Sequence, residues 1–247
     1  MYDNYFYKAA MYDLLANYYK YSNPNLHVFY YQKHLKYMNQ LIMANYEAAR
    51  EPQTRNPMVR IFHASPDTPS VDVYLNGKRT IRNLTYKQET DYLPLLEAGR
   101  YRIDIYPAGK TDKPIVSETF TFNEGQKYTV VAAGTLNTLD LLFIKDNNEV
   151  PSGETKIRFI HLSPNTPAVD IAVKNGDVLV SDITFKEVTD YLPLSPMTVN
   201  LEVRIAGTNK VVLELPPIRL RPNRTYTVYI VGLMNGKPGL EALVAQH

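Results

Sequence analysis

The chain has 247 residues, with 27 basic and 25 acidic side chains, so its formal net charge at pH 7 is only +2. This balance supplies no long-range electrostatic attraction for nucleic acid or for an anionic membrane, and we expect neither as a partner. The chain has no cysteine, which excludes disulfide bonds, thiolate metal sites and cysteine nucleophiles.

The N-terminal sequence, residues 1–8, lacks the basic start and uniform apolar core of a secretory signal peptide. No stretch of the chain is long and apolar enough to predict a membrane span. We therefore expect synthesis in the cytoplasm without a signal peptide, followed by assembly on a spore or cell surface.

Residues 1–57 predict a tyrosine-rich helical hairpin followed by a linker. Residues 3–21 are rich in Ala, Leu, Met and Tyr, which favours a first helix. Ser22-Asn23-Pro24 then interrupts the pattern, because Ser22 or Asn23 can cap a new helix and Pro24 suits its first turn. We expect the second helix to run from about Pro24 to Ala49. The prolines of residues 51–57 end it before the first strand.

The second predicted helix has a broad apolar face that a lone hairpin cannot bury. His27 and His34 lie in the middle of this face, where we expect them to bond to neighbouring tyrosine hydroxyls. Their separation of about 10 Å along the helix axis argues against a shared metal ion. The face either docks on the first repeat or associates with another chain, and both alternatives stay open. Its expected association residues are Tyr30, Tyr31, Tyr37, Met38, Leu41 and Ile42.

After residue 57 the chain contains a long internal repeat. Residues 59–73 read Val-Arg-Ile-Phe-His-Ala-Ser-Pro-Asp-Thr-Pro-Ser-Val-Asp-Val, and residues 157–171 read Ile-Arg-Phe-Ile-His-Leu-Ser-Pro-Asn-Thr-Pro-Ala-Val-Asp-Ile. Thr-Asp-Tyr-Leu-Pro-Leu occurs at residues 90–95 and 189–194, and Tyr-Thr-Val at residues 128–130 and 226–228. A period of about one hundred residues predicts two tandem domains. They cover residues 58–147 and 156–247, and residues 148–155 form the linker between them.

Both repeats show the two-residue alternation of β-strands, for example at residues 100–106 and 199–205. Asn-Gly dipeptides at residues 76–77 and 175–176 are typical of hairpin turns. Residues 128–134 and 226–232 are more continuously apolar, so we expect central strands there. The predicted fold class is mainly β with an N-terminal α-helical hairpin, followed by two tandem antiparallel immunoglobulin-like β-sandwich domains. The short polar linker allows the domains to move unless they share an apolar contact.

The repeated motif places His, Ser and Asp at matching offsets, which raises the question of a hydrolase. In both copies Pro follows Ser, so the backbone N–H that often acts as an oxyanion donor is missing. No Gly-x-Ser-x-Gly nucleophile elbow occurs. We therefore expect a structural motif and not an enzyme: a proline-stiffened loop whose His and Asp side chains bond to backbone groups. Its residues are His63, Ser65, Pro66, Pro69, Asp72, Asp91, His161, Ser163, Pro164, Pro167, Asp170 and Asp190.

A calcium site is a second alternative for this motif, through Asp72, Asp91 and loop carbonyls. Acidic residues are too sparse to favour it, since Asp67 of the first copy is replaced by Asn165 in the second. We expect neither a metal ion nor a cofactor.

Residues 58–247 resemble a known family on two motifs. His-x-Ser-Pro-x-x-Pro-x-Val-Asp and the later Asp-Tyr-Leu-Pro-Leu are similar to those of domain-of-unknown-function family 4397, in two copies. The resemblance implies β-sandwiches, frequently in tandem, of bacterial and archaeal envelope or extracellular proteins. No activity is attached to the family, so the resemblance assigns no catalytic residue. The tyrosine-rich hairpin and the lack of a signal peptide are departures from secreted relatives.

Two functions fit these observations. The first is a non-enzymatic structural or assembly protein of a bacterial spore or cell surface. Its hairpin would mediate association with copies of the same chain, as a homo-oligomer, or with other surface-layer proteins. The alternative is a ligand-binding or adhesion module, for example for glycans, that uses tyrosines near the interdomain cleft. The absence of Trp counts against a glycan platform, although Tyr can also stack on sugars.

Overall fold

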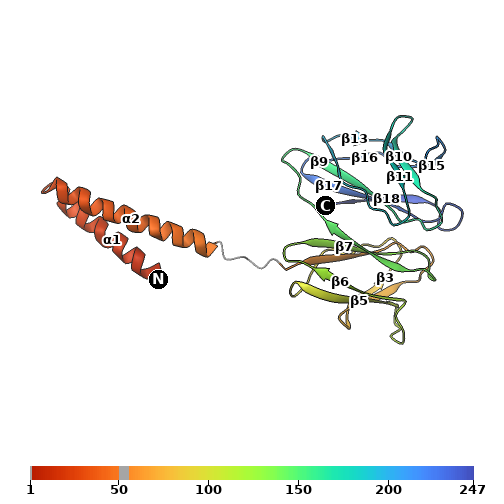
Figure 1. Cartoon of the computed structure of the whole chain (residues 1–247), viewed down its shortest axis with the longest axis horizontal. Helices are drawn as coiled ribbons and strands as arrows, with labels where there is room; N and C mark the ends of the chain where they lie inside the picture. The colour runs from red at the N-terminus through yellow and green to blue at the C-terminus, as the bar shows by residue number, and fades with distance from the viewer. Residues whose placement is uncertain (1, 50–55) are drawn as a thin grey trace. The chain divides into compact units, whose positions relative to one another are not determined.

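Two helices precede all the strands of the chain. The computed structural model describes residues 2–49 and 56–247, and the side chains of the helical part over residues 4–43 (Figure 1). Residues 50–55, which include most of the linker predicted at residues 51–57, lie outside the described residues. The chain divides into two compact units, Met1–Arg55 and Asn56–His247.

The first unit is the predicted hairpin. α1 spans Tyr2–Tyr19 and α2 spans Pro24–Ala49. The first helix ends two residues before the predicted Tyr21, and the bounds of the second are confirmed. Asn23 caps α2, because its Oδ1 accepts the backbone N–H of Leu26 at 3.2 Å. Pro24 takes the first helical position, where its missing N–H costs nothing.

Tyrosine rings from both helices form a continuous stack along the contact between α1 and α2. The ring of Tyr12 stacks on Tyr37 at 5.5 Å and on Tyr30 at 6.2 Å. Tyr19 stacks on Tyr30 at 5.7 Å, and Tyr5 lies 6.5 Å from Tyr37. These alternating contacts set the antiparallel register of the two helices.

The two histidines of the hairpin bond to backbone carbonyls. Nδ1 of His27 donates to the carbonyl oxygen of Ala16 at 2.8 Å, and Nδ1 of His34 donates to that of Ala9 at 3.0 Å. The expectation of tyrosine hydroxyl partners was therefore wrong. The small Ala side chains leave the backbone of α1 open to an imidazole. The ring of Tyr31 lies 6.0 and 5.9 Å from the two imidazoles.

The first β-sandwich has two four-stranded sheets. One has the order β4-β1-β7-β8 and the other β3-β2-β5-β6. The first sheet consists of β1 (Met58–His63), β4 (Leu93–Pro94), β7 (Lys127–Ala133) and β8 (Asp140–Asp146). The second consists of β2 (Val71–Leu75), β3 (Lys78–Leu84), β5 (Gly99–Pro107) and β6 (Val116–Phe122).

The second sandwich repeats this arrangement with the orders β12-β9-β17-β18 and β11-β10-β14-β15. The first of these sheets consists of β9 (Thr155–His161), β12 (Leu192–Leu194), β17 (Arg224–Val231) and β18 (Glu241–Gln246). The other consists of β10 (Val169–Val173), β11 (Val178–Ile183), β14 (Leu201–Ile205) and β15 (Val211–Glu214). A two-stranded sheet of β13 (Thr198–Val199) and β16 (Ile218–Arg219) completes it.

The mainly β class with an N-terminal helical hairpin is confirmed, and one detail of the sandwich prediction is corrected. β1 pairs with β7, and β9 with β17, in parallel, so the sandwiches are not purely antiparallel. β7 and β17 are central strands, as their apolar sequences predict. Asn76 and Gly77 both have positive φ, 49° and 79°, as a two-residue type I′ turn between β2 and β3 requires.

The sheets β4-β1-β7-β8 and β12-β9-β17-β18 are buried on both faces. In β7, Tyr128, Val130 and Ala132 face the core of their own sandwich, whereas Val131 and Ala133 join a second apolar cluster. That cluster also contains Phe62, Ala64 and Ile144 of the first sandwich with Ile160, Leu162, Tyr229 and Val231 of the second. The short linker of residues 148–155 would by itself allow the two sandwiches to move relative to each other. The apolar cluster that they share joins them in one compact unit.

Every strand pairs within its own half of residues 56–247, so no described sheet mixes strands of the two sandwiches. Neither described helix combines the length and the hydropathy that a bilayer crossing requires.

Candidate functional site

The contact between the two sandwiches is built from equivalent residues of the two repeats. Arg60 of β1 and Arg158 of β9 occupy the same position, between apolar residues that face the two sandwich cores. Each guanidinium donates from Nε to a threonine of the neighbouring parallel strand, Thr129 at 2.7 Å and Thr227 at 3.1 Å. Both arginines are buried, with 3% and 2% of their surface exposed.

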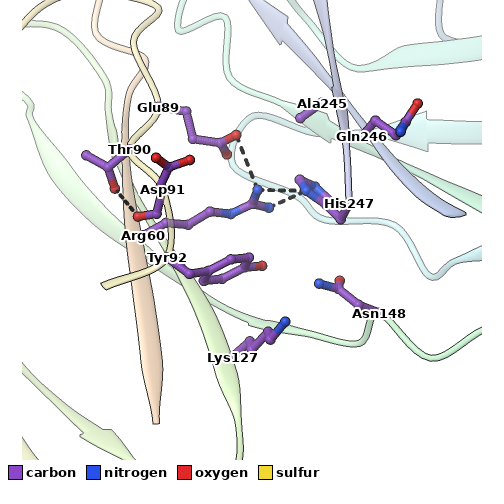
Figure 2. A pocket seen from close by; sticks show the side chains of 10 residues that line it. All are labelled: Arg60, Glu89, Thr90, Asp91, Tyr92, Lys127, Asn148, Ala245, Gln246 and His247. Atoms are coloured by element: carbon purple, nitrogen blue, oxygen red, sulfur yellow. Dashed lines mark hydrogen bonds and ion pairs between the residues drawn. The ribbon is translucent and has the colours of Figure 1, made fainter. Parts of the chain in front are cut away.

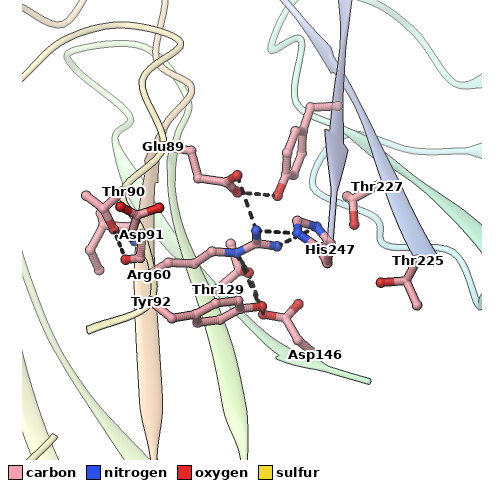
Figure 3. A network of polar contacts seen from close by, with 12 residues as sticks. Arg60, Glu89, Thr90, Asp91, Tyr92, Thr129, Asp146, Thr225, Thr227 and His247 are labelled. Atoms are coloured by element: carbon pink, nitrogen blue, oxygen red, sulfur yellow. Dashed lines mark hydrogen bonds and ion pairs between the residues drawn. The ribbon is translucent and has the colours of Figure 1, made fainter. Parts of the chain in front are cut away.

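Asp146 is the carboxylate at the centre of this polar network (Figure 3). Its side chain is fully buried and forms an ion pair with Arg158 of the other sandwich. It also accepts hydrogen bonds from the hydroxyls of Thr129, at 2.6 Å, and Tyr92, at 2.7 Å. Arg60 Nε lies 3.9 Å from the same carboxylate. Asp146 therefore links buried cations of both repeats.

Arg60 makes the reciprocal contact from the first sandwich to the second. Its two terminal nitrogens lie 2.8 and 2.9 Å from the ring nitrogens of His247 (Figure 3). Its Nη1 also forms an ion pair of 3.2 Å with Glu89. Burial, and next the charge of Arg60, lowers the pKa of His247 to about 4. His247 is therefore neutral at pH 7, and one ring nitrogen can accept from Arg60.

Glu89 also crosses the interface, because its carboxylate accepts a hydrogen bond of 2.7 Å from the hydroxyl of Tyr229. Burial raises the pKa of Glu89, although Arg60 and the Tyr229 hydroxyl partly offset it. The ring of Tyr229 stacks on Phe62 at 4.4 Å. The interface thus combines a polar part with an apolar part that excludes water.

A cavity of about 400 Å³ opens beside this network, between the two sandwiches (Figure 2). Its lining from the first sandwich is Arg60, Glu89, Thr90, Asp91, Tyr92 and Lys127. The rest of the lining is Asn148, Ala245, Gln246 and His247. Charges of both signs line it, so the cavity has no preference for anions or for cations.

Tyr92 is the tyrosine that lines this cavity. Cations cover its ring: the guanidinium of Arg60 lies 4.8 Å and Lys127 Nζ 5.1 Å from its centroid. The equivalent Tyr191 has the same arrangement, with Arg158 at 4.8 Å and Lys156 at 4.5 Å. The Tyr of Asp-Tyr-Leu-Pro-Leu thus makes a cation–π contact to the strand arginine in both repeats.

The predicted His-Ser motif lies elsewhere, in the loop after β1. The ring of His63 is buried, and its Nε2 donates to the carbonyl oxygen of Pro69 at 3.2 Å. Burial lowers the pKa of His63, although this hydrogen bond opposes the shift. Ser65 Oγ lies 2.6 Å from Thr68 Oγ1 and 3.4 Å from an Asp67 carboxylate oxygen. The serine is thus engaged inside its own loop and not with the imidazole.

The second copy of the motif repeats the histidine bond and the contact between serine and threonine. His161 Nε2 donates to the carbonyl oxygen of Pro167 at 3.2 Å, and Ser163 Oγ lies 2.6 Å from Thr166 Oγ1. Asn165 replaces Asp67 and keeps its contact to the neighbouring loop, but not the contact of Asp67 to the serine. Asn165 Oδ1 accepts the N–H of Met234, and Asp67 Oδ1 that of Leu136, both at 2.9 Å. Pro66 and Pro164 are half-buried beside these serines.

The aspartates that end the motif accept backbone N–H groups from two turns. Asp72 accepts from Asn83 at 2.8 Å and from Gly109 at 3.2 Å, and Arg79 lies 3.3 Å away. Burial alone would raise the pKa of Asp72, but these donors outweigh it, so the pKa is lowered.

Asp170 repeats the contacts of Asp72, accepting from Asp182 at 2.8 Å and from Gly207 at 2.9 Å. Asp91 and Asp190 differ, because their side chains are exposed. Only their backbone carbonyls take part in a hydrogen bond, each from the preceding threonine hydroxyl at 2.9 Å.

The structure therefore separates the sequence motif from the interface network. In the described ranges, no three His, Asp or Glu side chains gather closely enough to hold a metal ion. Sequence reasoning missed Arg60, Arg158, Asp146, Tyr229 and His247. One signal was present: an arginine at the same position of both repeats, inside a strand that is otherwise apolar.

No curated protein matches the chain. The C-terminal domain of AlgF from P. aeruginosa is 20% identical, with 38% of this chain and 99% of that domain covered and a TM-score of 0.31. A provisionally named cell adhesion protein from Bacteroides ovatus is 10% identical, with 78% and 96% covered and a TM-score of 0.23.

A fimbrial assembly protein from Parabacteroides distasonis is 11% identical, with 76% of this chain and 94% of that protein covered and a TM-score of 0.22. All three scores are too low to establish a shared overall fold. A family model gives the more direct result. Residues 57–172, which contain the whole first sandwich and the first two strands of the second, match the family described as a domain of unknown function, DUF4397.

Proposed function

We propose that the chain is a non-enzymatic structural or assembly protein of a spore or cell surface. Its double sandwich is the rigid body, and its helical hairpin is the element that associates. One observation carries this proposal: the hairpin leaves many large apolar side chains exposed and fully buries very few. Among the described side chains of residues 4–43, only Ala9 and Ala16 are fully buried.

The exposed apolar surface of the hairpin is large. Phe6, Leu14 and Ile42 are 59%, 73% and 54% exposed, and Tyr18 reaches 75%. Together such side chains exceed the few hundred Å² of contiguous apolar surface that soluble monomers usually tolerate. Burial against another chain would remove this surface from water.

The six expected association residues take different places in the hairpin. Tyr31 and Ile42 are exposed and free to contact a partner. Tyr30 and Tyr37 belong to the stack between α1 and α2. Met38 and Leu41 are partly buried. We propose that the exposed residues, and not the stacked tyrosines, make the contact.

We also propose that residues 58–147 and 156–247 are two copies of the same domain. The buried contacts of His63 recur at His161, and those of Asp72 at Asp170. In this proposal the motif has a structural role, because its side chains bond to loop groups. The shared apolar layer and the Asp146 ion pair then make the pair of domains a stiff spacer.

Light scattering after size exclusion tests the association. The full chain should be oligomeric, and a fragment of residues 56–247 should be monomeric. The fragment begins before Pro57, because the Pro57 carbonyl accepts the N–H of Leu95 at 2.9 Å. A monomeric full chain contradicts the proposal, and an oligomeric fragment assigns the contact to the sandwiches.

A ligand-binding role is the second candidate, and the interdomain cavity favours it. The cavity of about 400 Å³ is large enough for a small sugar, and Tyr92 lines it. The cations on the ring of Tyr92 compete with sugar stacking. Calorimetric titration of the 56–247 fragment with a panel of oligosaccharides tests this role. Binding that becomes tighter in Lys127→Ala, which removes one cation from the ring of Tyr92, would support it, and no binding by the unaltered fragment would contradict it.

A further inference from the structure

The outer surface of α1 carries an apolar stripe of regular spacing. Its residues are Tyr7, Met11, Leu14, Tyr18 and, just beyond the helix end, Tyr21, with exposed fractions of 70%, 46%, 73%, 75% and 90%. Successive members lie four, three, four and three residues apart. Each of them comes two positions after a residue that faces α2. The residues that face α2 are Tyr5, Ala9, Tyr12, Ala16 and Tyr19. Two positions are about 200° around a helix, so this α1 stripe points away from α2.

A second stripe of the same kind runs along α2. Its residues are Val28, Tyr31, Leu35, Met38 and Ile42, spaced three, four, three and four residues apart. Four of them are 45% to 54% exposed, and Met38 is partly buried. The first four come directly after the residues that contact α1, which are His27, Tyr30, His34 and Tyr37. One position is about 100° around the helix, so this α2 stripe lies on the flank of the hairpin.

The two stripes have the spacing that the existing contact between the helices uses. Inside the hairpin, the contact residues of α1 are spaced four, three, four and three residues apart, and they pack antiparallel against contact residues of α2 spaced three, four and three apart. The α1 stripe has the same spacing as the α1 contact residues. The α2 stripe has the spacing of the α2 contact residues, extended by one step. The α2 stripe extends over about 21 Å of helix and the helical part of the α1 stripe, from Tyr7 to Tyr18, over about 17 Å, so their lengths are similar. None of the ten residues is charged, so pairing them buries no unpaired charge.

We infer that the α1 stripe of one copy of the chain docks antiparallel on the α2 stripe of a second copy. This inference rests on the proposed association of the hairpin and names the partner and the contact surfaces. The two stripes together expose roughly 1,000 Å² of side-chain surface, judged from the area that such side chains bury, which reaches the lower limit for a specific interface.

The contact is heterologous, because the α1 stripe points away from α2 whereas the α2 stripe lies on the flank, so the two stripes face different directions and one partner cannot cover both. A copy that has docked through its α1 stripe still has a free α2 stripe. Such contacts either close into a ring or continue as an open chain of copies. A second copy fits both stripes with the same spacing, whereas an unrelated partner would need a matching surface for each of them.

Two single substitutions test this pairing, because each blocks one stripe. Leu14→Glu places a charge in the α1 stripe, and Leu35→Glu places one in the α2 stripe. Gln32→Glu adds the same charge at an exposed polar position of α2 and is the control. Leu14 and Leu35 are 73% and 45% exposed, so the helix content measured by circular dichroism should be retained. Light scattering should give the mass of one chain, 28.3 kDa, for each leucine variant alone.

The decisive sample is an equimolar mixture of Leu14→Glu and Leu35→Glu. It contains one intact α1 stripe and one intact α2 stripe, so the mass should rise to that of two chains and no further. Unaltered chain and Gln32→Glu should both form larger species. Oligomers of Leu35→Glu alone would instead show that α1 stripes pair with each other, and would overturn the inference. A monomeric mixture beside an oligomeric unaltered chain would also overturn it but would leave the proposed function standing. A monomeric unaltered chain contradicts both.

Discussion

Replacement of Asp146 by Asn tests the view that one buried carboxylate holds the two sandwiches together. The substitution keeps the size of the side chain and removes its charge. Asp146 is fully buried and faces Arg158, whose side chain is only 3% exposed. Without the carboxylate, Arg158 stays in a site that water does not reach.

The expected loss is large because the buried guanidinium of Arg158 keeps only neutral partners and loses its carboxylate. Removal of one member of a buried ion pair typically costs about 3 to 5 kcal/mol. The exposed pair of Lys174 and Glu214 is the internal reference, since its side chains are 45% and 59% exposed. Glu214→Gln makes the same chemical change there and should cost far less, because water already solvates both groups of an exposed pair.

Urea unfolding of the 56–247 fragment, followed by near-ultraviolet circular dichroism, measures both losses. For a unit of this size, a loss of 3 to 5 kcal/mol corresponds to a fall in Tm of about 6 to 20 °C. Asp146→Asn with Arg158→Met should recover part of the loss, because the double variant removes the unpaired cation. Equal stability of Asp146→Asn and Glu214→Gln would refute the reasoning, as would a double variant no more stable than Asp146→Asn.

Three further predictions concern the sandwiches. His63→Ala or His161→Ala should each cost about 1 to 3 kcal/mol in urea unfolding, because the bonds to the Pro69 and Pro167 carbonyls are lost; unchanged stability would contradict this. Because the pKa of His247 is lowered to about 4, the unfolded state binds a proton between pH 6.5 and pH 4 that the folded state does not. Stability should therefore be full above pH 6.5 and fall toward pH 4, less steeply in His247→Gln; equal slopes would argue against this role. Gly232→Ala should lower the Tm far more than Gly153→Ala. The two glycines have nearly the same φ, +87° and +85°, but only at Gly232 would an added Cβ meet a backbone oxygen, that of Gly239 at 2.1 Å. Similar losses in the two variants would show that the positive φ, and not the contact with the Gly239 oxygen, determines the loss of stability.

Much of the local structure follows from the sequence. The start of α2 depends on Asn23 and Pro24, which act within one turn of the chain. The turn between β2 and β3 depends on Asn76 and Gly77, which accept positive φ. Strand positions follow from the two-residue alternation and are repeated in both halves. These features depend on residues that are close together in the chain, so the sequence alone predicts them.

The partners of the histidines in the hairpin show where such a reading ends. The helical period places His27 and His34 on the face that contacts α1. It does not say that an alanine opposite each ring leaves a backbone carbonyl within reach. That contact depends on the register between α1 and α2, which the stack of tyrosines sets.

By itself, the sequence determined a repeated β-domain behind a helical hairpin, and it indicated that β7 and β17 are apolar on both faces. Only the tertiary structure decided what covers their second face. The answer is the equivalent sheet of the other repeat, with Asp146 of one half against Arg158 of the other. The physical reason is that periodicity shows which residues share a face, whereas the surface that covers this face is chosen by the packing of elements distant in the chain.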